Sequence, residues 1–444
     1  MSKMNMRSAG NRPSWLLLLL GIVVCVLTAI AASEPVRAHG ERNQEPFLRM
    51  RTVNFYDVKF SVPDNAKLTV NDELTMTGKF RLFNYWPASV AAPGLIYMNA
   101  ATAGAAFVKK ESWVNETSAI QSFKGELGGD YEFKVVLQAR TPGPWHVHPM
   151  VNVQDAGGLL GPGLQVEVSG DQNDFVYPVT TLGGTEIASL DSYGIGNVYR
   201  WHIVWAVIAV AWLLWWIRRP VLMPRFLMSR TGEDEDELVT ETDFWVAAGF
   251  AVLTIGLVTA GYFYTVAKYP TTIPLQTGTA FVDPLPEAPS IPIKVKKAKF
   301  YVPGRTVLAD VQITNDSDSP IQIGEFASVN LRFVNLEVPA AAATIEKGYP
   351  REYLPPEGLK VSDNTPIAPG ETRTVKIEAT DASWELERLT SLLSDPDSTL
   401  GGLLFFYDST GKRYVSEMFS PMIPVFRQEP ADQSAEMGGA PAKL

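Results

Sequence analysis

Residues 201–217 read WHIVWAVIAVAWLLWWI, and this run decides how the chain is organised because it is apolar apart from His202. A second run, from Phe244 to Ala267, is also apolar and carries no charge. An α-helix rises about 1.5 Å per residue and the apolar core of a membrane is about 30 Å thick, so runs of this length suit membrane crossing. The sequence therefore predicts two transmembrane helices, at 197–218 and 244–267.

The charges beside the two runs predict their orientation. Arginines occupy positions 218, 219, 225 and 230 of the connecting segment, whereas the outer flanks carry only Arg200 and Lys268. Basic residues favour the cytoplasmic side of a membrane. We therefore expect a cytoplasmic loop at 219–243 and a two-pass protein of the bacterial inner (or intracytoplasmic) membrane, with both large domains in the periplasm. His202, beside Trp201, is interpreted as an interfacial side chain.

Short alternating segments predict a β domain on each side of the helices. Val58, Phe60 and Val62 alternate with polar residues, and residues 307–313 follow the same pattern. This spacing of strands predicts a β-sandwich or Greek-key barrel over 39–196 and another over 293–427, including a hairpin with strands at 405–407 and 413–415 and a short helix within 381–393. The proline-rich linker 268–292 is expected to be extended, and the tail 428–444 disordered.

Residues 1–38 have the features of a secretory signal peptide. A basic start precedes an apolar core, and Val36-Arg37-Ala38 resembles a cleavage site. The chain's only cysteine, Cys25, lies in this leader, so the mature chain offers no thiolate for a disulfide, an iron–sulfur cluster or a blue-copper site. Cleavage leaves 34 basic and 47 acidic residues, and a net charge of −13 argues against nucleic-acid binding.

Three of the four histidines suggest a metal site in the first β domain. Cleavage makes His39 the first residue, with an α-amino group and a ring nitrogen that together chelate one ion. His146 and His148 are two residues apart in a predicted strand and therefore share a face. Four nitrogens suit Cu(II) in a tetragonal site. Each histidine also has a simpler interpretation, as a chance residue after the cleavage site or as a pair of ordinary strand histidines. Glu41 is a candidate outer partner of a ligand, or a solvated carboxylate.

The order of several motifs resembles the B subunit of the copper membrane monooxygenases, the family of particulate methane monooxygenase and ammonia monooxygenase. The matching stretches are HGE at 39–41, EPFLRMRT at 45–52, WHVH at 145–148, KYPTTIPLQ at 268–276, VPGR at 302–305, APGET at 368–372 and GGLLFF at 401–406. The resemblance covers residues 39 to about 427.

The resemblance implies two cupredoxin-like domains joined by two transmembrane helices. It implies copper at His39, His146 and His148, and assembly with the A and C subunits into a trimer of three-subunit protomers. It implies insertion of one oxygen atom of O2 into a small gaseous substrate. WHVH and SDNTP at 362–366 look closer to methane-type members, with ammonia or a short alkane as the alternative. The resemblance does not place the oxygen-activating copper in this subunit.

One departure from the family pattern concerns a further copper site that some members carry in this subunit. The two histidines of that site correspond here to Asn54 and Arg81. An arginine repels a metal cation, so we expect this second site to be absent.

Two other functions compete with the monooxygenase interpretation. A non-catalytic periplasmic copper-binding protein would use the same amino-terminal histidine. A secreted polysaccharide monooxygenase would also use such a histidine, but the paired membrane helices argue against it.

Overall fold

The structure of the chain is a computed structural model that describes residues 46–102, 104–119, 122–154, 156–181, 184–217, 227–228, 230–231, 239–269, 279–386 and 399–426. The predicted signal peptide, His39, Glu41, most of the loop 219–243 and the tail 428–444 lie outside these residues. The chain divides into two compact units. One contains the described residues up to Gln172 and from Thr279 onwards, and the other those from Asn173 to Gly278.

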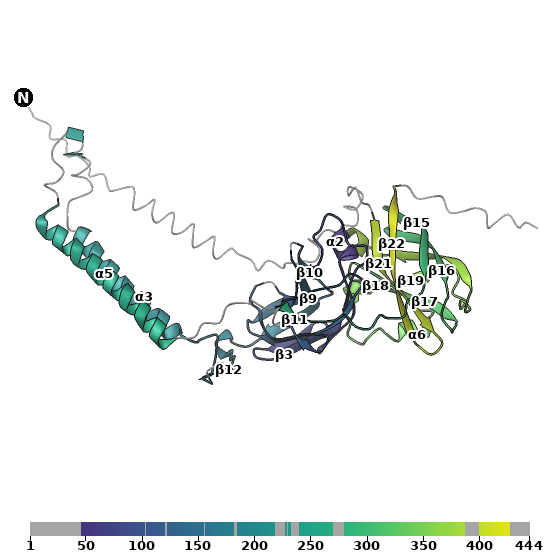
Figure 1. Cartoon of the computed structure of the whole chain (residues 1–444), viewed down its shortest axis with the longest axis horizontal. Helices are drawn as coiled ribbons and strands as arrows, with labels where there is room; N and C mark the ends of the chain where they lie inside the picture. The colour runs from purple at the N-terminus through teal and green to yellow at the C-terminus, as the bar shows by residue number, and fades with distance from the viewer. Residues whose placement is uncertain are drawn as a thin grey trace, which may run out of the picture. The chain divides into compact units, whose positions relative to one another are not determined.

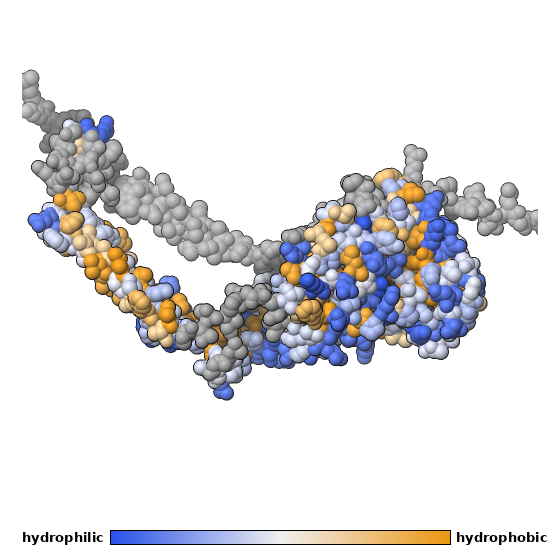
Figure 2. Space-filling model, viewed as in Figure 1, coloured by the Kyte–Doolittle hydropathy of each residue, from blue (hydrophilic) through white to orange (hydrophobic). Residues whose placement is uncertain are grey.

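The smaller unit contains a pair of long apolar helices, which lie side by side (Figure 1). The turn η2 (Gln172–Asp174) leads into this unit from the larger one, and the elements of the unit are β12 (Val179–Thr180), β13 (Glu186–Ile187), α3 (Ile195–Ile217) and α5 (Glu241–Lys268). The ring of Trp212 lies 5.1 Å from that of Phe250, and Trp215 Nε1 donates to Asp243 Oδ1 at 3.0 Å. Both helices are long and apolar enough to cross a membrane. Figure 2 shows apolar side chains along the surface of this pair.

Helix α3 begins before the apolar run that predicted it. It contains 23 residues, or about 35 Å of helix, because the turn from Ile195 to Arg200 continues the helical backbone despite its polar side chains. A helix of this length matches the thickness of the apolar core, so it could span the membrane without local thinning of the bilayer. Helix α5 begins at a capping box, in which Thr240 accepts from the backbone of Asp243 and Asp243 accepts from the backbone of Thr240.

The first β domain is a sandwich of two sheets around one core. Helix α2 (Pro46–Arg51) precedes it. The first sheet has the order β1 (Val53–Phe60), β3 (Glu73–Leu82), β8 (Asp130–Ala139), β5 (Phe107–Val114), β6 (Thr117–Ser118). The second has the order β14 (Thr279–Ala280), β7 (Ser122–Phe123), β4 (Ile96–Ala101), β9 (Gly143–Val153), β11 (Leu164–Ser169), β2 (Ala66–Thr69), with β10 (Gly157–Leu160) paired to β9. Phe80 and Phe133 from the first sheet pack with Val147 and Val151 from the second.

The second β domain is built from one eight-stranded sheet that folds over its own core. Its order is β18 (Leu331–Val334), β17 (Ile321–Ser328), β21 (Thr399–Asp408), β22 (Arg413–Val425), β15 (Ile293–Tyr301), β16 (Thr306–Thr314), β20 (Thr372–Thr380), β19 (Leu359–Val361). Strand β22 pairs with β21 through its first part and with β15 through its end, so it links the two halves. Val311 and Ile377 from one half meet Phe326 and Phe406 from the other.

Two predictions within this second domain can be checked against the structure. The predicted hairpin is confirmed, because Tyr407 of β21 pairs with Arg413 of β22. The short helix α7 (Ser383–Leu386) lies inside the predicted segment, and Asp381 Oδ1 accepts from the backbone nitrogen of Ser383 at 2.6 Å. Helix α6 (Pro339–Ala342) and the 3-10 turn η4 (Arg351–Tyr353) lie in the connection between β18 and β19.

The two β domains pack against each other as parts of one unit. Tyr56 and Phe83 of the first domain share a buried apolar cluster with Leu403, Phe405 and Val415 of the second. Burial of aromatic and aliphatic surface of this kind is the main favourable contribution to such an interface. The site described below lies in the first domain but is contacted by the second.

Candidate metal centre

Strand β9 brings His146 and His148 together. Val147 between them is fully buried in the sandwich core, so the two histidines point to the opposite face. Their ring centroids are 4.2 Å apart and the rings are inclined at 63°. The prediction that the two side chains share a face of one strand is confirmed by this geometry.

The outer nitrogen of each ring lies beside an oxygen acceptor. His148 Nδ1 donates to the carbonyl oxygen of Gly161 at 2.9 Å. His146 Nε2 lies 3.3 Å from Oε1 of Glu352, in the turn η4 of the second β domain. The Gly161 carbonyl favours a proton on Nδ1 of His148, which leaves the lone pair of that ring on its inner nitrogen, Nε2. The contact between His146 Nε2 and Glu352 does not have the geometry of a hydrogen bond, so it does not fix the proton of His146.

The two inner nitrogens face each other. His148 Nε2 lies 3.2 Å from His146 Nδ1. The contact is a hydrogen bond between the two rings, in which Nδ1–H of a neutral His146 donates to the bare Nε2 of His148. A metal ion shared by the two rings would take the place of that proton. Two nitrogens bound to one ion at about 2.0–2.1 Å each lie at most about 4 Å apart, so the observed separation fits a common ion. Imidazole nitrogens suit copper, zinc, nickel and iron.

A glycine loop packs closely against both rings. A Cβ on Gly163 would lie 2.5 Å from His148 Cε1 and 2.7 Å from His146 Nε2, so only glycine fits here. The backbone nitrogen of Gly163 donates to the hydroxyl of Tyr353 at 2.9 Å. The loop is therefore held between the histidine pair and the second β domain.

The described part of the chain contains no group of three metal-ligating side chains. Two imidazoles alone make an incomplete site for copper, which takes four ligands in a tetragonal geometry. The third predicted ligand residue, His39, and its neighbour Glu41 lie outside the described residues. The remaining histidine, His202, is exposed on α3, where its Nδ1 donates to the carbonyl of Val198 at 2.8 Å.

Asn54 and Arg81 are directly paired across strands β1 and β3. Asn54 Nδ2 donates to the carbonyl of Met50 at 3.0 Å. Arg81 lies between two carboxylates, with Nη1 2.7 Å from Asp130 Oδ2 and Nε 2.7 Å from Glu417 Oε1. Burial works against the charge on the guanidinium, but the two carboxylates outweigh it and hold the pKa of Arg81 above its ordinary value. The absence of a second copper site here stays a prediction.

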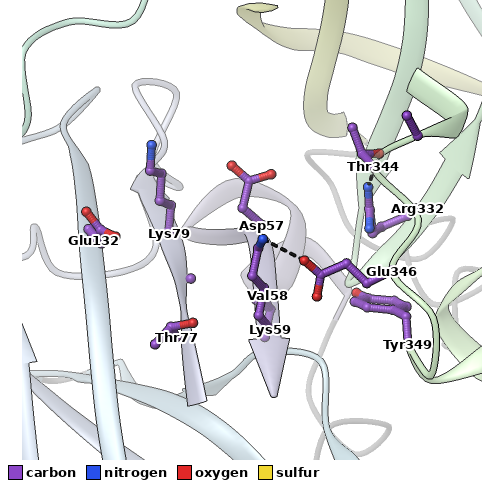
Figure 3. A pocket seen from close by; sticks show the side chains of 12 residues that line it. Asp57, Val58, Lys59, Thr77, Lys79, Glu132, Arg332, Thr344, Glu346 and Tyr349 are labelled. Atoms are coloured by element: carbon purple, nitrogen blue, oxygen red, sulfur yellow. Dashed lines mark hydrogen bonds and ion pairs between the residues drawn. The ribbon is translucent and has the colours of Figure 1, made fainter. Parts of the chain in front are cut away.

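A separate cleft of about 390 Å³ lies between the two β domains (Figure 3). No histidine lines it. Lys59 Nζ contacts Glu346 Oε1 at 2.5 Å across the cleft, and Arg332 on its wall is bound to Glu325. These charges are matched by partners of opposite sign, so we interpret the cleft as part of the domain junction.

Some residues at the histidine pair were not predicted from the sequence. The contacts of Gly161 and Gly163 with the two rings are among them, because a glycine in a loop does not show what it packs against. Glu352 and Tyr353 are about 200 positions further along the chain than the histidines, and no local pattern marks them. Asp130 and Glu417, the partners of Arg81, were missed for the same reason.

Two packed β domains and a pair of apolar helices long enough to cross a membrane fit a membrane protein, and its first β domain carries a pair of facing imidazoles. The family of monooxygenase B subunit proteins matches residues 40–426. The chain is 43% identical over 409 residues to a protein of Methylococcus capsulatus (strain Bath) named particulate methane monooxygenase alpha subunit, covering 92% of this chain and 97% of that protein. The chain therefore belongs to the monooxygenase B subunit family, and it is a subunit of a membrane monooxygenase complex.

Similarity to solved structures is slight. The cupredoxin domain of amoB from Nitrosocaldus yellowstonii is 20% identical, with a TM-score of 0.22, over 28% of this chain and 91% of that domain. Fibronectin(III)-like modules of CbhA from Clostridium thermocellum are 7% identical, with a TM-score of 0.13, over 84% of this chain and 95% of theirs.

Proposed function

We propose that this chain is the copper-binding B subunit of a membrane monooxygenase that converts methane to methanol. The observation that carries the copper proposal is the histidine pair, whose inner nitrogens face each other at 3.2 Å. The α-amino group and ring of His39, at the start of the mature chain, would complete a four-nitrogen site. Such a donor set suits Cu(II).

The roles of the individual residues follow from their contacts. His146 and His148 bind the ion, and the Gly161 carbonyl orients His148 through its Nδ1–H. Gly163 allows both rings to approach the loop. Copper, when bound here, supplies a redox-active centre. We propose ligation for these histidines, and we assign oxygen insertion to the whole complex rather than to this subunit alone.

Methane is the proposed substrate because the relative from Methylococcus capsulatus is named for it. The motifs WHVH and SDNTP favour the same choice. In the overall reaction one atom of O2 enters a C–H bond, and the other leaves as water with two electrons and two protons from a reductant. Ammonia and short alkanes are the alternatives that a substrate assay must separate.

The arrangement in the membrane is part of the proposal. We place α3 and α5 across the bacterial inner (or intracytoplasmic) membrane, in contact with lipid, with both β domains in the periplasm. The family is named for a B subunit, which implies other subunits. We propose the A and C subunits as these partners, in a trimer of three-subunit protomers.

Replacing a proposed ligand tests the copper site. His146→Ala and His148→Ala should each weaken copper binding by about 10-fold or more, since loss of an outer partner alone costs about 10–100-fold. His202→Ala is the matched control, because this histidine lies on α3 and should leave copper binding unchanged. Equal copper affinity in all four proteins would contradict the proposed ligands.

Oxygen uptake by native membranes separates the functions. With methane, ammonia or butane as the only substrate, the proposal predicts fastest uptake with methane. Purification in detergent should also recover two further apolar subunits with this chain. A chain that purifies alone, binds copper and supports no substrate-dependent oxygen uptake would instead be a non-catalytic copper-binding protein.

A further inference from the structure

A groove opens between the two apolar helices, at the end where α3 begins and α5 ends. It has a volume of about 530 Å³, and its walls come from both helices. Positions 197, 201 and 205 of α3 recur every four residues, and positions 257, 261, 264 and 268 of α5 recur every three or four. Residues at this spacing lie on one side of a helix, so each helix contributes one face to the groove.

The two basic residues of the outer helix flanks meet at this groove. Arg200 is in the second turn of α3, and Lys268 is the last residue of α5. None of the described residues that line the groove is acidic, and neither cation forms an ion pair with a carboxylate in the described part of the chain. The groove therefore carries two positive charges that this part of the chain does not neutralise.

Aromatic side chains surround the cationic end of the groove. Lys268 Nζ lies 5.7 Å from the centre of the Tyr264 ring and 5.5 Å from that of the Tyr269 ring. The rings of Trp201 and Trp205 stack at 6.5 Å along the wall that α3 provides. Tyrosine and tryptophan are enriched where a membrane helix meets the lipid head groups. The cationic end of the groove therefore lies at head-group level when the helix pair crosses a membrane.

The other end of the groove is apolar. Leu257 and Val258 line it about three turns before Lys268, or about 15 Å further along α5 towards the middle of the membrane. Gly261 leaves space between the two ends, because a Cβ there would meet no atom within 4 Å. A ligand that fits the whole groove has a negatively charged head and an apolar chain.

We propose that this groove binds one anionic phospholipid, with its phosphate between Arg200 and Lys268 and an acyl chain along Leu257 and Val258. Basic pockets between membrane helices bind anionic head groups in this way. A zwitterionic lipid fits less well, because the lining offers no carboxylate to its ammonium group and Lys268 already covers the faces of two tyrosines. The site rests on the membrane crossing in the proposed function, but it needs neither copper nor oxygen chemistry.

The test titrates the intact chain in detergent with phosphatidylglycerol or phosphatidylcholine, and native mass spectrometry counts the bound lipid. The wild type should bind one phosphatidylglycerol more tightly than phosphatidylcholine. Arg200→Gln and Lys268→Gln should each weaken phosphatidylglycerol binding by about fivefold, and the double variant by about 25-fold, the usual contribution of basic residues at a membrane surface. Lys268→Arg keeps the charge and should retain most of the affinity.

Matched variants separate the charge from the shape of the groove. Lys294→Gln removes an exposed lysine of the second β domain and should leave the affinity for both lipids unchanged. Gly261→Trp fills the groove and keeps both cations, so it should also weaken phosphatidylglycerol binding. Gly256→Trp places the same side chain on another face of α5 and should not. Inorganic phosphate in excess should not displace the lipid, because it has no chain for the apolar end of the groove.

Several results would overturn the proposed site. Equal binding of the two lipids by the wild type would do so, as would equal phosphatidylglycerol affinity in the double variant and in Lys294→Gln. Displacement by inorganic phosphate would show that the two cations bind a free anion instead of a lipid.

The purified complex provides the last outcome. The double variant should retain about one phosphatidylglycerol fewer per chain than the wild type, in proportion to the one site proposed. An unchanged lipid content would show that another subunit covers the groove, and would also overturn the site. A chain that binds phosphatidylglycerol but no copper contradicts the proposed function and leaves this site standing.

Discussion

Arg81 Nε donates to Glu417 Oε1 at 2.7 Å, although the two residues are 336 positions apart in the chain. Arg81 belongs to β3 of the first β domain and Glu417 to β22 of the second. The guanidinium also donates to Asp130 at 2.7 Å, so one cation lies between two carboxylates at the domain border. The side chains of Arg81, Glu417 and Asp130 are 9%, 6% and 4% exposed, respectively. Burial of this extent makes the three charges depend on one another.

Removal of the cation should strongly destabilise the β domains. Arg81→Ala leaves Asp130 and Glu417 buried without their shared partner, and the free energy of unfolding should fall by about 3–5 kcal/mol, the usual cost of breaking a buried pair. Denaturant unfolding followed by circular dichroism measures the change. Lys110→Ala is the control, because it breaks an exposed pair with Glu73 and should cost less than about 1 kcal/mol. Equal effects of the two substitutions would contradict this role of Arg81.

The same position provides a test of the missing second copper site. Asn54 and Arg81 are directly paired across β1 and β3, so histidines at both positions would have Cβ atoms about 4.5–5.5 Å apart. The double variant Asn54→His, Arg81→His should bind about one more copper ion per chain than the wild type, with Asp130 and Glu417 available as carboxylate partners. Elemental analysis after dialysis gives the stoichiometry. Asn54→His alone keeps the arginine and should bind no more copper than the wild type. A copper ion bound at this position in that variant or in the wild type would contradict the predicted absence of a second site.

A second ion pair across the domain border predicts a specific dependence of stability on pH. Asp57 lies at a β-bulge with a φ of 53°, and its Oδ1 accepts from Arg413 Nη1 at 2.6 Å. Burial acts to raise the pKa of Asp57, but the hydrogen bonds and charge of Arg413 outweigh it, and the pKa lies below its ordinary value.

The sign of the pH effect follows from this lowered pKa. The unfolded chain protonates Asp57 near pH 3.9 while the folded chain does not, so unfolding takes up a proton and stability falls as the pH falls below about 5. Asp57→Asn keeps a residue that tolerates positive φ but does not titrate. Its deficit in unfolding free energy should therefore be largest above pH 5 and shrink towards pH 3. If the difference in unfolding free energy between Asp57→Asn and the wild type stayed constant between pH 5 and pH 3, the ion pair would not be its cause.

Labelling of single cysteines tests the proposed topology. The only cysteine, Cys25, lies in the predicted signal peptide, so the mature wild type should not react with a maleimide. Ser409→Cys, on the exposed turn between β21 and β22, should react with a membrane-impermeant maleimide from the periplasmic side. Val239→Cys, at the start of the α5 segment, should react only after the membrane is disrupted. The opposite pattern would reverse the orientation inferred from the arginines.

The sequence predicted those features that depend on neighbouring residues. The alternation around Val147 placed His146 and His148 on one face, and the apolar runs located both helices. Helix α3 begins at Ile195, two residues before the predicted start at 197. The chain leaves the compact unit of the two β domains at Gln172, whereas we expected the first β domain to extend to 196. It re-enters that unit after the two helices, where β14 (Thr279–Ala280) pairs with β7 of the first β domain.

Contacts between distant segments could not be predicted in this way. Glu352 is an ordinary charged residue in a loop, and only the packing of the two β domains brings it to His146. Glu417 likewise follows the alternating pattern of its strand, and no neighbouring residue in the sequence identifies Arg81 as its partner. A single sequence carries periodicity and turn preferences, but the pairing of buried charges across a domain border depends on tertiary structure.

Electron–nuclear double resonance on the copper-loaded chain, oxidised to Cu(II), identifies the nitrogens that bind the copper. The protein is prepared with ¹⁵N only in the histidine rings. We predict three labelled ring nitrogens on the copper, from His39, His146 and His148, and one unlabelled nitrogen from the α-amino group of His39. Copper bound without labelled nitrogens, or with two ring nitrogens and no amine, would contradict a site built from the amino terminus and strand β9.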